Sequence, residues 1–441
     1  MHSAPRSPRS RYGRWLKIAI AALVVAVVTV TVLIVMQLFG TPDTPGAGSS
    51  AQSAGQDSSA PASAPARQGS PLSPGWQGDG KSVTLAFGGD VHFEGPLGSR
   101  LVTSPATALD GIATLVKGAN LAMANFESAL VDSTCPDPQP KQFVFYAPPT
   151  AITALRSAGL SVVTEANNHG EDCGQAGLMQ SLAIARTTHF PIVGVGRDAA
   201  QAFAPYRAVL HGQRISVIAA TEVLDTNLQA AWTATATQPG LASAYQEGEL
   251  VAAVQAARKT SDTVVVFLHW GTETSQCPNA LQEPLARALV KAGADIVVGS
   301  HAHVQLGAGY LGTALVDYGL GNLAFYDTTT PETYSGTLLV TVTGRHIDGF
   351  SWRPALIESG LPVPQTGAAA TAAVQRWQGL RGCTDLSLAP TASRATTKTE
   401  NDPFTGPAVV PQADPPGGSP GGSPATTRRA VAITRDTGKR Q

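Results

Sequence analysis

The chain has 441 residues and a formal net charge of −1, and only 14% of its residues are charged. Proteins that bind nucleic acids concentrate basic residues on one face, so this balanced composition argues against a nucleic-acid partner. Glycine (45 residues) and proline (32 residues) are abundant but unevenly spread, so the chain has to be interpreted segment by segment.

The N-terminal forty residues predict a membrane anchor. Basic residues in segment 1–17 precede the uncharged, almost wholly apolar run 18–39. About 20 helical residues cross a bilayer core, and this run exceeds the roughly 7–15 apolar residues of a cleaved signal peptide. Because no charge follows until Asp43, segment 1–17 is expected in the cytoplasm and the rest outside a single-pass cell-membrane anchor. A signal peptide cleaved near Ala47 or Ala51 is the alternative, and it also exports the protein.

Two low-complexity stretches bound the folded part. Segment 40–80 consists mostly of Ser, Ala, Gly, Pro and Gln, and segment 389–441 is rich in Pro and Gly. Such compositions cannot bury enough apolar surface to offset their conformational entropy, so both are predicted to be disordered. One extracytoplasmic domain, 81–388, lies between them.

Within this domain short apolar strands alternate with helical patterns. In chain order, we predict strands or helices at 83–87 (strand), 106–116 (helix), 119–124 (strand), 149–157 (helix), 161–164 (strand), 175–185 (helix), 192–195 (strand), 263–268 (strand), 281–292 (helix) and 295–298 (strand). Three further strands, 311–316, 336–343 and 346–352, follow with no helix between them. This order predicts an α/β domain with two packed sheets and outer helices.

Residues able to bind metal ions gather at the ends of five predicted strands. Ligands of open α/β sheets bind beyond the carboxyl ends of the strands, so side chains from successive strand ends can reach one site. In chain order these residues are Asp90, His92, Asn125, Glu127, Asn168, His169, His269, His301 and His303. Their repeated placement predicts a common site.

The residue types and their spacing indicate a transition-metal site. Asp90 and His92 are separated by one residue, as are His301 and His303, and side chains at i and i+2 of an extended segment point the same way. Imidazole, carboxylate and amide ligands without thiolate suit Zn, Mn or Fe better than Ca or Mg. Glu127 is the natural carboxylate to bridge two divalent ions about 3.5–4 Å apart. The predicted metal ligands are Asp90, His92, Glu127, Asn168, His269, His301 and His303.

Each cluster also has a purely structural interpretation. Asp90 could cap a turn, and Asn168 could adopt a left-handed turn conformation. His269 could be a core histidine, and Glu127 could lie on the surface. The conjunction at successive strand ends is what favours a site. The remaining histidines are interpreted as structural or solvated: His2, His189, His211 and His346.

Four cysteines are expected to form disulfides. An even number in an exported protein predicts two bridges, and none of the four belongs to a CxxC pair that would indicate a zinc–thiolate site. Three pairings are possible among Cys135, Cys173, Cys277 and Cys383.

The order and spacing of the motifs resemble the CapA (poly-γ-glutamate capsule synthesis) family over about residues 83–357. The segments that carry the resemblance are Phe87–His92, Ala124–Glu127, Asn167–Gly174, His269–Glu273, Gly293–His303 and Gly319–Asn322. The resemblance implies a fold of the calcineurin-like metallophosphoesterase type, a four-layer α/β/β/α sandwich with a dinuclear metal site.

The resemblance also implies roles for these residues. One ion would be held by Asp90, His92 and His303, and the second by Asn168, His269 and His301. Glu127 would bridge the two ions, where the metallophosphoesterase pattern usually has an Asp, and Asn167 stands where a Gly is usual. The residues expected to act in catalysis are His169, as general acid or transition-state stabiliser, with Asp90 and Glu127.

The function implied is work on an anionic capsule or cell-envelope polymer or its precursor. The first hypothesis is a dinuclear-metal hydrolase in which a metal-bound hydroxide attacks a phosphoester or related bond. The second is a non-catalytic partner that binds the polymer in a membrane synthesis or export complex. Both hypotheses place the domain outside the membrane, attached through its N-terminal helix.

Overall fold

The structure is a computed structural model, and it describes residues 79–132, 134–326 and 329–391. The predicted cytoplasmic segment, the predicted transmembrane helix 18–39, nearly all of the predicted linker and the C-terminal tail beyond Thr391 lie outside the described residues. None of the helices within the described ranges combines the length and apolar character needed to span a membrane.

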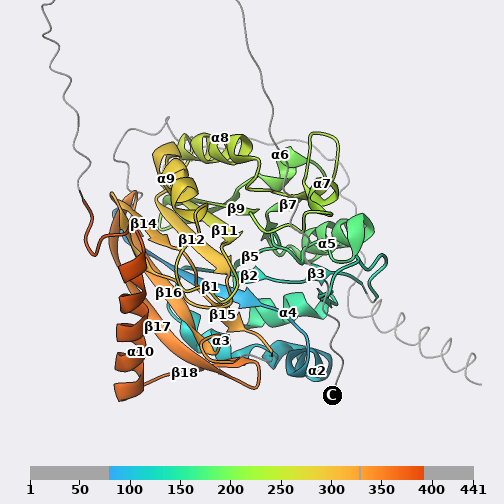
Figure 1. Cartoon of the computed structure of the whole chain (residues 1–441), viewed down its shortest axis with the longest axis horizontal. Coiled ribbons are helices and arrows are strands. Elements are labelled where there is room, and N and C mark those ends of the chain that lie inside the picture. The colour runs from blue at the N-terminus through green and yellow to red at the C-terminus, as the bar shows by residue number, and fades with distance from the viewer. Residues whose placement is uncertain (1–78, 133, 327–328, 392–441) are drawn as a thin grey trace, which may run out of the picture. The chain divides into compact units, whose positions relative to one another are not determined.

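Two β-sheets form the centre of the domain (Figure 1). The larger sheet has the order β18 (Leu361–Pro364), β17 (His346–Glu358), β16 (Tyr334–Thr343), β1 (Val83–Val91), β2 (Leu121–Phe126), β5 (Val162–Thr164) and β6 (Ile192–Val193), with β15 (Asn322–Ala324) beside β1. The smaller sheet has the order β13 (Ala308–Leu311), β14 (Ala314–Asp317), β12 (Ile296–His301), β11 (Thr263–Trp270), β9 (Gln213–Thr221) and β8 (Tyr206–Leu210). Two short ribbons pair β3 (Ala129–Leu130) with β4 (Tyr146–Ala147) and β7 (Val195–Gly196) with β10 (Gly240–Leu241).

The inner faces of the two sheets pack on each other. Side chains alternate along a strand, so β1 directs Leu85 and Phe87 inward while β11 directs Val265 and Phe267 toward them in one apolar cluster. Parallel pairing joins β1, β2, β5 and β6 in the larger sheet and β9, β11, β12 and β14 in the smaller one. Strands that are buried on both faces explain the unbroken apolar runs that the sequence presents.

Helices cover the two outer faces. The chain also forms α2 (Pro96–Thr103), η1 (Pro105–Thr107), α3 (Asp110–Val116), α4 (Thr150–Ser157), α5 (Gly174–Thr188), α6 (Ala199–Ala202), α7 (Gln229–Trp232), α8 (Glu247–Arg258), α9 (Gln282–Ala292), α10 (Gly367–Gly379) and η2 (Leu380–Cys383). Apolar residues of α2, α3 and α4 pack on the outer face of the larger sheet, and those of α8 and α9 on the outer face of the smaller sheet. Figure 1 shows these two groups at opposite sides of the strands. The order of layers is therefore helix, sheet, sheet, helix.

The predicted mixed α/β organisation is confirmed, but two of the predicted strands are wrong in detail. The segment 311–316 is a hairpin, because Gly312 adopts a left-handed backbone (φ 67°) and turns the chain between β13 and β14. The segment 192–195 is broken between β6 and β7 at Gly194 (φ 83°). Asp90 and His269 are the penultimate residues of β1 and β11 rather than lying after these strands.

The expected pair of disulfides is confirmed, and the structure selects one of the three possible pairings. Cys135 is bonded to Cys173, and Cys277 is bonded to Cys383. The first bridge joins the loop after β3 to the start of α5, and the second joins the segment after β11 to η2.

Candidate metal centre

The candidate centre lies between the two sheets, at the carboxyl ends of their parallel strands. On β2 the inward alternation of Leu121 and Met123 continues to Asn125, and on β11 that of Val265 and Phe267 continues to His269. The polar ends of opposing strands therefore meet where the apolar layer between the sheets ends, with the Asn125 Nδ2 atom 3.2 Å from the His269 Nδ1 atom.

Asp90 reaches this point because β1 approaches a neighbouring turn very closely. A Cβ atom on Gly89 would lie 1.6 Å from the main-chain oxygen of Gly321, so only glycine fits there. The same approach pairs Asp90 with Asn322 of β15 and gives a hydrogen bond of 3.1 Å from the Asp90 amide to the Gly321 oxygen. Asn322 in turn lies 2.9 Å from the His303 Nδ1 atom through its Oδ1 atom.

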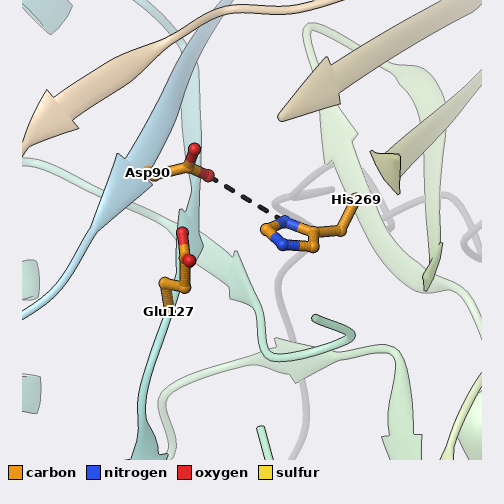
Figure 2. Close-up of side chains that lie close together, drawn as sticks. All are labelled: Asp90, Glu127 and His269. Carbon is orange, nitrogen blue, oxygen red and sulfur yellow. Dashed lines mark ion pairs between the residues drawn. The ribbon is translucent and has the colours of Figure 1, made fainter. Parts of the chain in front are cut away.

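Asp90, Glu127 and His269 form the core of the centre (Figure 2). All three are buried, and one ligand atom of each lies within 4.8 Å of the others. The Asp90 Oδ1 atom accepts a hydrogen bond of 2.8 Å from Asn125 Nδ2 and lies 4.0 Å from the His269 Nδ1 atom. Figure 2 shows the Glu127 carboxylate beside this pair.

Glu127 has a carboxylate oxygen with no hydrogen-bond partner among the described residues. Its Oε1 atom is buried and lies 3.8 Å from His303 Nε2 and 3.9 Å from His169 Nε2. Its Oε2 atom accepts a hydrogen bond of 3.3 Å from Asn125 Nδ2. Leaving a buried carboxylate oxygen unpaired is costly, so this atom is one that a cation would satisfy.

His301 and His303 follow one another around a turn at the end of β12. Both adopt left-handed backbone conformations (φ 95° and 57°), which are unfavourable for residues other than glycine and are often found at functional sites. The His301 amide donates to Asp90 Oδ2 at 3.2 Å, and His303 Nδ1 lies 3.5 Å from the same oxygen. The His301 ring lies 4.8 Å from the His269 ring, and its buried Nδ1 atom has no partner among the described residues.

His92 is placed differently from the other predicted ligands. Its ring is stacked on Phe325 at 3.9 Å, and its Nε2 atom accepts a hydrogen bond of 3.0 Å from the Tyr326 amide. Its Nδ1 atom is buried and has no partner in the described part of the chain. Metal ligation through Nε2 would require this hydrogen bond to break.

Asn168 and His169 enter the centre from the loop after β5. The Asn168 Oδ1 atom lies 2.7 Å from His269 Nε2. The His169 Nδ1–H donates to the Asp172 carboxylate at 2.6 Å, so its Nε2 atom is directed toward Glu127. Phe145 stacks on the His169 ring at 4.1 Å. The imidazole is thereby held by one carboxylate and one aromatic ring.

Burial dominates the electrostatics of the centre. It raises the pKa of Asp90, and it raises the pKa of Glu127 well above its ordinary value, with Asp90 adding to the effect. It lowers the pKa of His269 well below the usual range and that of His301 to about 3, so both rings are neutral at physiological pH. Neutral imidazoles have a nitrogen lone pair free to bind a metal ion. Buried carboxyl groups that are costly to ionise alone become carboxylates when a divalent cation compensates their charge.

The sequence predicts Asn125 at the centre without a role as a metal ligand, and it does not predict Asp172 or Lys141 there. Asn125 contacts Asp90, Glu127 and His269, in agreement with its predicted place at the end of a strand. Asp172 lies three residues after His169, within the segment Asn167–Gly174. Lys141 comes from a loop without periodicity, and no sequence signal indicated it.

A second buried pair of carboxyl groups, Glu165 and Glu171, lies in the loop that carries Asn168. Burial raises the pKa of Glu165 to about 8, although Ser181 and the Leu130 amide donate to it. Burial and the neighbouring Glu165 raise the pKa of Glu171 to about 9. Each carboxyl has one oxygen without a partner among the described residues.

Glu165→Gln is therefore expected to stabilise the protein at alkaline pH. Between its ordinary pKa of 4.5 and about 8, the unfolded carboxyl loses its proton while the folded one retains it, so the stability of the wild type falls as pH rises. Glutamine removes this loss, and we expect a gain on the order of 3 kcal/mol at pH 8 and none at pH 4. Urea unfolding across pH 4–8 measures the difference in unfolding free energy between the variant and the wild type. The control is Glu358→Gln, which changes an exposed carboxyl group. If the free energies of Glu165→Gln and the wild type change in parallel with pH, the expectation is wrong.

Comparisons with known proteins agree on one family. The family model described as bacterial capsule synthesis protein PGA_cap matches residues 84–327, which is more than half of the chain. The chain is 27% identical over 262 residues to the capsule biosynthesis protein CapA of Bacillus anthracis, covering 58% of this chain and 63% of that protein. It is 33% identical over 177 residues to the PGA biosynthesis protein CapA of Bacillus subtilis, covering 40% and 45%. The alignments thus span about half to three fifths of these relatives.

More distant similarities are found among curated proteins and solved structures. A probable polyglutamine synthesis accessory protein of Mycobacterium tuberculosis is 24% identical over 220 residues, covering 48% of this chain and 55% of that protein. Among solved structures, a phosphatase from Mycoplasma pneumoniae has a TM-score of 0.40 at 12% identity, covering 63% of this chain and 94% of that one. A 5'-nucleotidase from Candida albicans has a TM-score of 0.35 at 11% identity, covering 68% and 57%. The TM-scores of both structures are below 0.5, so the fold is described from the strand order and the packing of the two sheets.

Proposed function

The chain belongs to the bacterial capsule synthesis protein family, and we propose on that basis that it is an accessory protein for the synthesis of a polyglutamate-type capsule or envelope polymer. We propose further that it is a dinuclear-metal hydrolase with a calcineurin-like metallophosphoesterase fold. The observation that carries this proposal is the buried cluster of Asp90, Glu127 and His269, in which Glu127 keeps an unpaired oxygen.

The residues of the centre divide into ligands and a proton-handling histidine. Asp90, Glu127, Asn168, His269, His301 and His303 would hold the metal ions. His92 would join them through Nε2 only if that atom is released from the Tyr326 amide, whereas its buried Nδ1 atom has no partner among the described residues. When bound, the ions would polarise the scissile bond and lower the pKa of an attacking water. His169 donates through Nδ1 to Asp172, so Nε2 is the atom that would exchange a proton with a substrate.

The proposed setting is outside a membrane. Segment 1–17 would lie in the cytoplasm and helix 18–39 would anchor the protein, with the domain facing the envelope polymer or its precursor. The two disulfides support this placement, because such bonds persist in oxidising, exported compartments. A partner complex for synthesis or export in the membrane is part of the proposal.

A second candidate function is a non-catalytic polymer-binding or export partner. Two observations favour it: a Glu stands in the bridging position where metallophosphoesterases usually have an Asp, and the Nε2 atom of His92 is occupied by a main-chain donor. A longer bridging side chain and a His92 ring whose Nε2 atom is occupied would weaken the binding of one of the two ions. Turnover of phosphoesters such as bis(p-nitrophenyl) phosphate by the metal-loaded protein would favour the hydrolase. Polyglutamate binding without turnover would favour the second candidate.

The first test of the metal centre is the metal content of the purified full chain. We expect close to two transition-metal ions per wild-type chain, and a loss of both in the double variant His301→Ala/His303→Ala. The His303 imidazole lies 3.5 Å from Asp90 and 3.8 Å from Glu127, and the His301 ring lies 4.8 Å from the His269 ring. The matched control is His211→Ala/His346→Ala, which removes two exposed histidines and leaves the metal content unchanged. Elemental analysis measures the number of metal ions per chain in the wild type and both variants. A folded wild type that holds no stoichiometric metal after reconstitution would remove the hydrolase proposal.

A further inference from the structure

A buried lysine touches the candidate centre from outside the set of predicted ligands. The Lys141 side chain is only 8% exposed, although it comes from the loop between β3 and β4. Its Nζ atom lies 2.6 Å from Asp172 Oδ1, donates to the main-chain oxygen of Asn168, and lies 5.0 Å from the centre of the Trp232 ring. A buried ammonium is costly unless it is paired, so these contacts fix its position.

Through these contacts Lys141 joins two functional side chains. Asn168, which the Nζ atom holds by its main-chain oxygen, presents its Oδ1 atom to His269. Asp172, which the Nζ atom holds by Oδ1, accepts the Nδ1–H of His169 on Oδ2. The Phe145 amide donates to the same Oδ2 atom at 2.7 Å. One cation thus sets the position of a predicted metal ligand and of the proton-handling histidine.

The loop that carries Lys141 is tied to the segment it contacts. The Cys135–Cys173 disulfide attaches the loop to the residue next to Asp172. The Gln139 amide donates to the main-chain oxygen of Asp172 at 2.9 Å. A Cβ atom on Gly174 would lie 2.5 Å from the Asp137 carboxylate, so the two segments are in close contact. The disulfide therefore holds Lys141 within reach of Asn168 and Asp172.

We infer that Lys141 is a positioning residue of the metal centre, held in place by the Cys135–Cys173 disulfide. The inference depends on the proposed metal-binding function. Residues that orient metal ligands from outside the ligand shell typically change metal affinity by 10–100-fold when they are replaced. Removing the ammonium leaves the Asn168 carbonyl and the Asp172 carboxylate without their common donor, so Asn168 loses its fixed orientation toward His269.

The test is the Zn²⁺ affinity of the full chain, measured by competition with a chelating dye. Lys141→Met is expected to weaken Zn²⁺ binding 10–100-fold, and Lys141→Arg, which keeps the charge, is expected to restore most of the affinity. The matched control is Arg258→Met, which removes a cation from the buried Asp295 at the opposite end of β12 and leaves the affinity unchanged.

The outcomes separate this inference from the proposed function. Wild-type affinity in a folded Lys141→Met variant would overturn the role of Lys141 and leave the metal centre standing, whereas a wild type that binds no Zn²⁺ would overturn the proposed function itself. If Lys141→Met does not unfold cooperatively, Cys135→Ser/Cys173→Ser decides, because Lys141 is then intact but its loop is untied. Binding weakened at least 10-fold supports the inference, and an unchanged dissociation constant overturns it.

Discussion

Replacing Glu127 by glutamine is expected to stabilise the metal-free protein while removing most of its metal binding. The carboxyl is buried, its Oε1 atom has no partner among the described residues, and burial together with Asp90 raises its pKa well above the ordinary value. The sign follows from linkage: above pH 4.5 the unfolded carboxyl ionises more readily than the folded one, so the wild type without metal loses stability as pH rises. Glutamine has the same shape and no charge.

The expected size is about 1–3 kcal/mol in the presence of chelator, because glutamine keeps a neutral polar group in the buried position and removes the cost of burying an ionisable one. With metal the order reverses. At a metal concentration about 1,000 times the dissociation constant, the wild type gains about 4.1 kcal/mol from binding, and the variant, which lacks the bridging carboxylate, gains far less. Urea unfolding at pH 7 with chelator and with Zn²⁺ gives both values. A Glu127→Gln variant less stable than the wild type in chelator would show that the folded state favours the ionised carboxylate.

Opposite signs in the two conditions would be informative because stability and function conflict at this point. A cluster of buried charges destabilises the protein on its own and becomes favourable only when a cation occupies it. An exposed acid such as Glu358 should show neither effect when changed to glutamine.

The sequence predicted the centre because strand ends obey simple geometry. Side chains alternate along a strand, and parallel strands end at one edge, so Asp90, His269 and His301 could be assigned to one place before the structure was known. The same geometry predicted Asn125 beside them, at the end of β2. The hairpin at Gly312 was missed because apolar residues stand on both sides of the turn, and a continuous apolar run does not reveal where a strand reverses.

The place of Lys141 at the centre could not be predicted from the sequence. Lys141 lies in a loop with no apolar period, and its place at the centre depends on which cysteines pair. Four cysteines permit three pairings, and nothing in their spacing selects Cys135 with Cys173. The occupied Nε2 atom of His92 is a similar case, because the donor is the main-chain amide of Tyr326, far along the chain.

Removal of the Cys277–Cys383 disulfide is expected to cost about 5 kcal/mol of stability, against about 4 kcal/mol for Cys135–Cys173. In the chain-entropy model the loss grows with the length of the closed loop, and the bridged residues are 106 and 38 apart in the two cases. The longer bridge also holds η2 and the neighbouring α10, whose Trp377 stacks on Trp352 at 5.3 Å at the edge of the sheets. Urea unfolding of Cys277→Ser/Cys383→Ser and Cys135→Ser/Cys173→Ser compares the two. The reverse order of losses would mean that the contacts of the Lys141 loop with Asp172, rather than chain entropy, determine what each disulfide contributes.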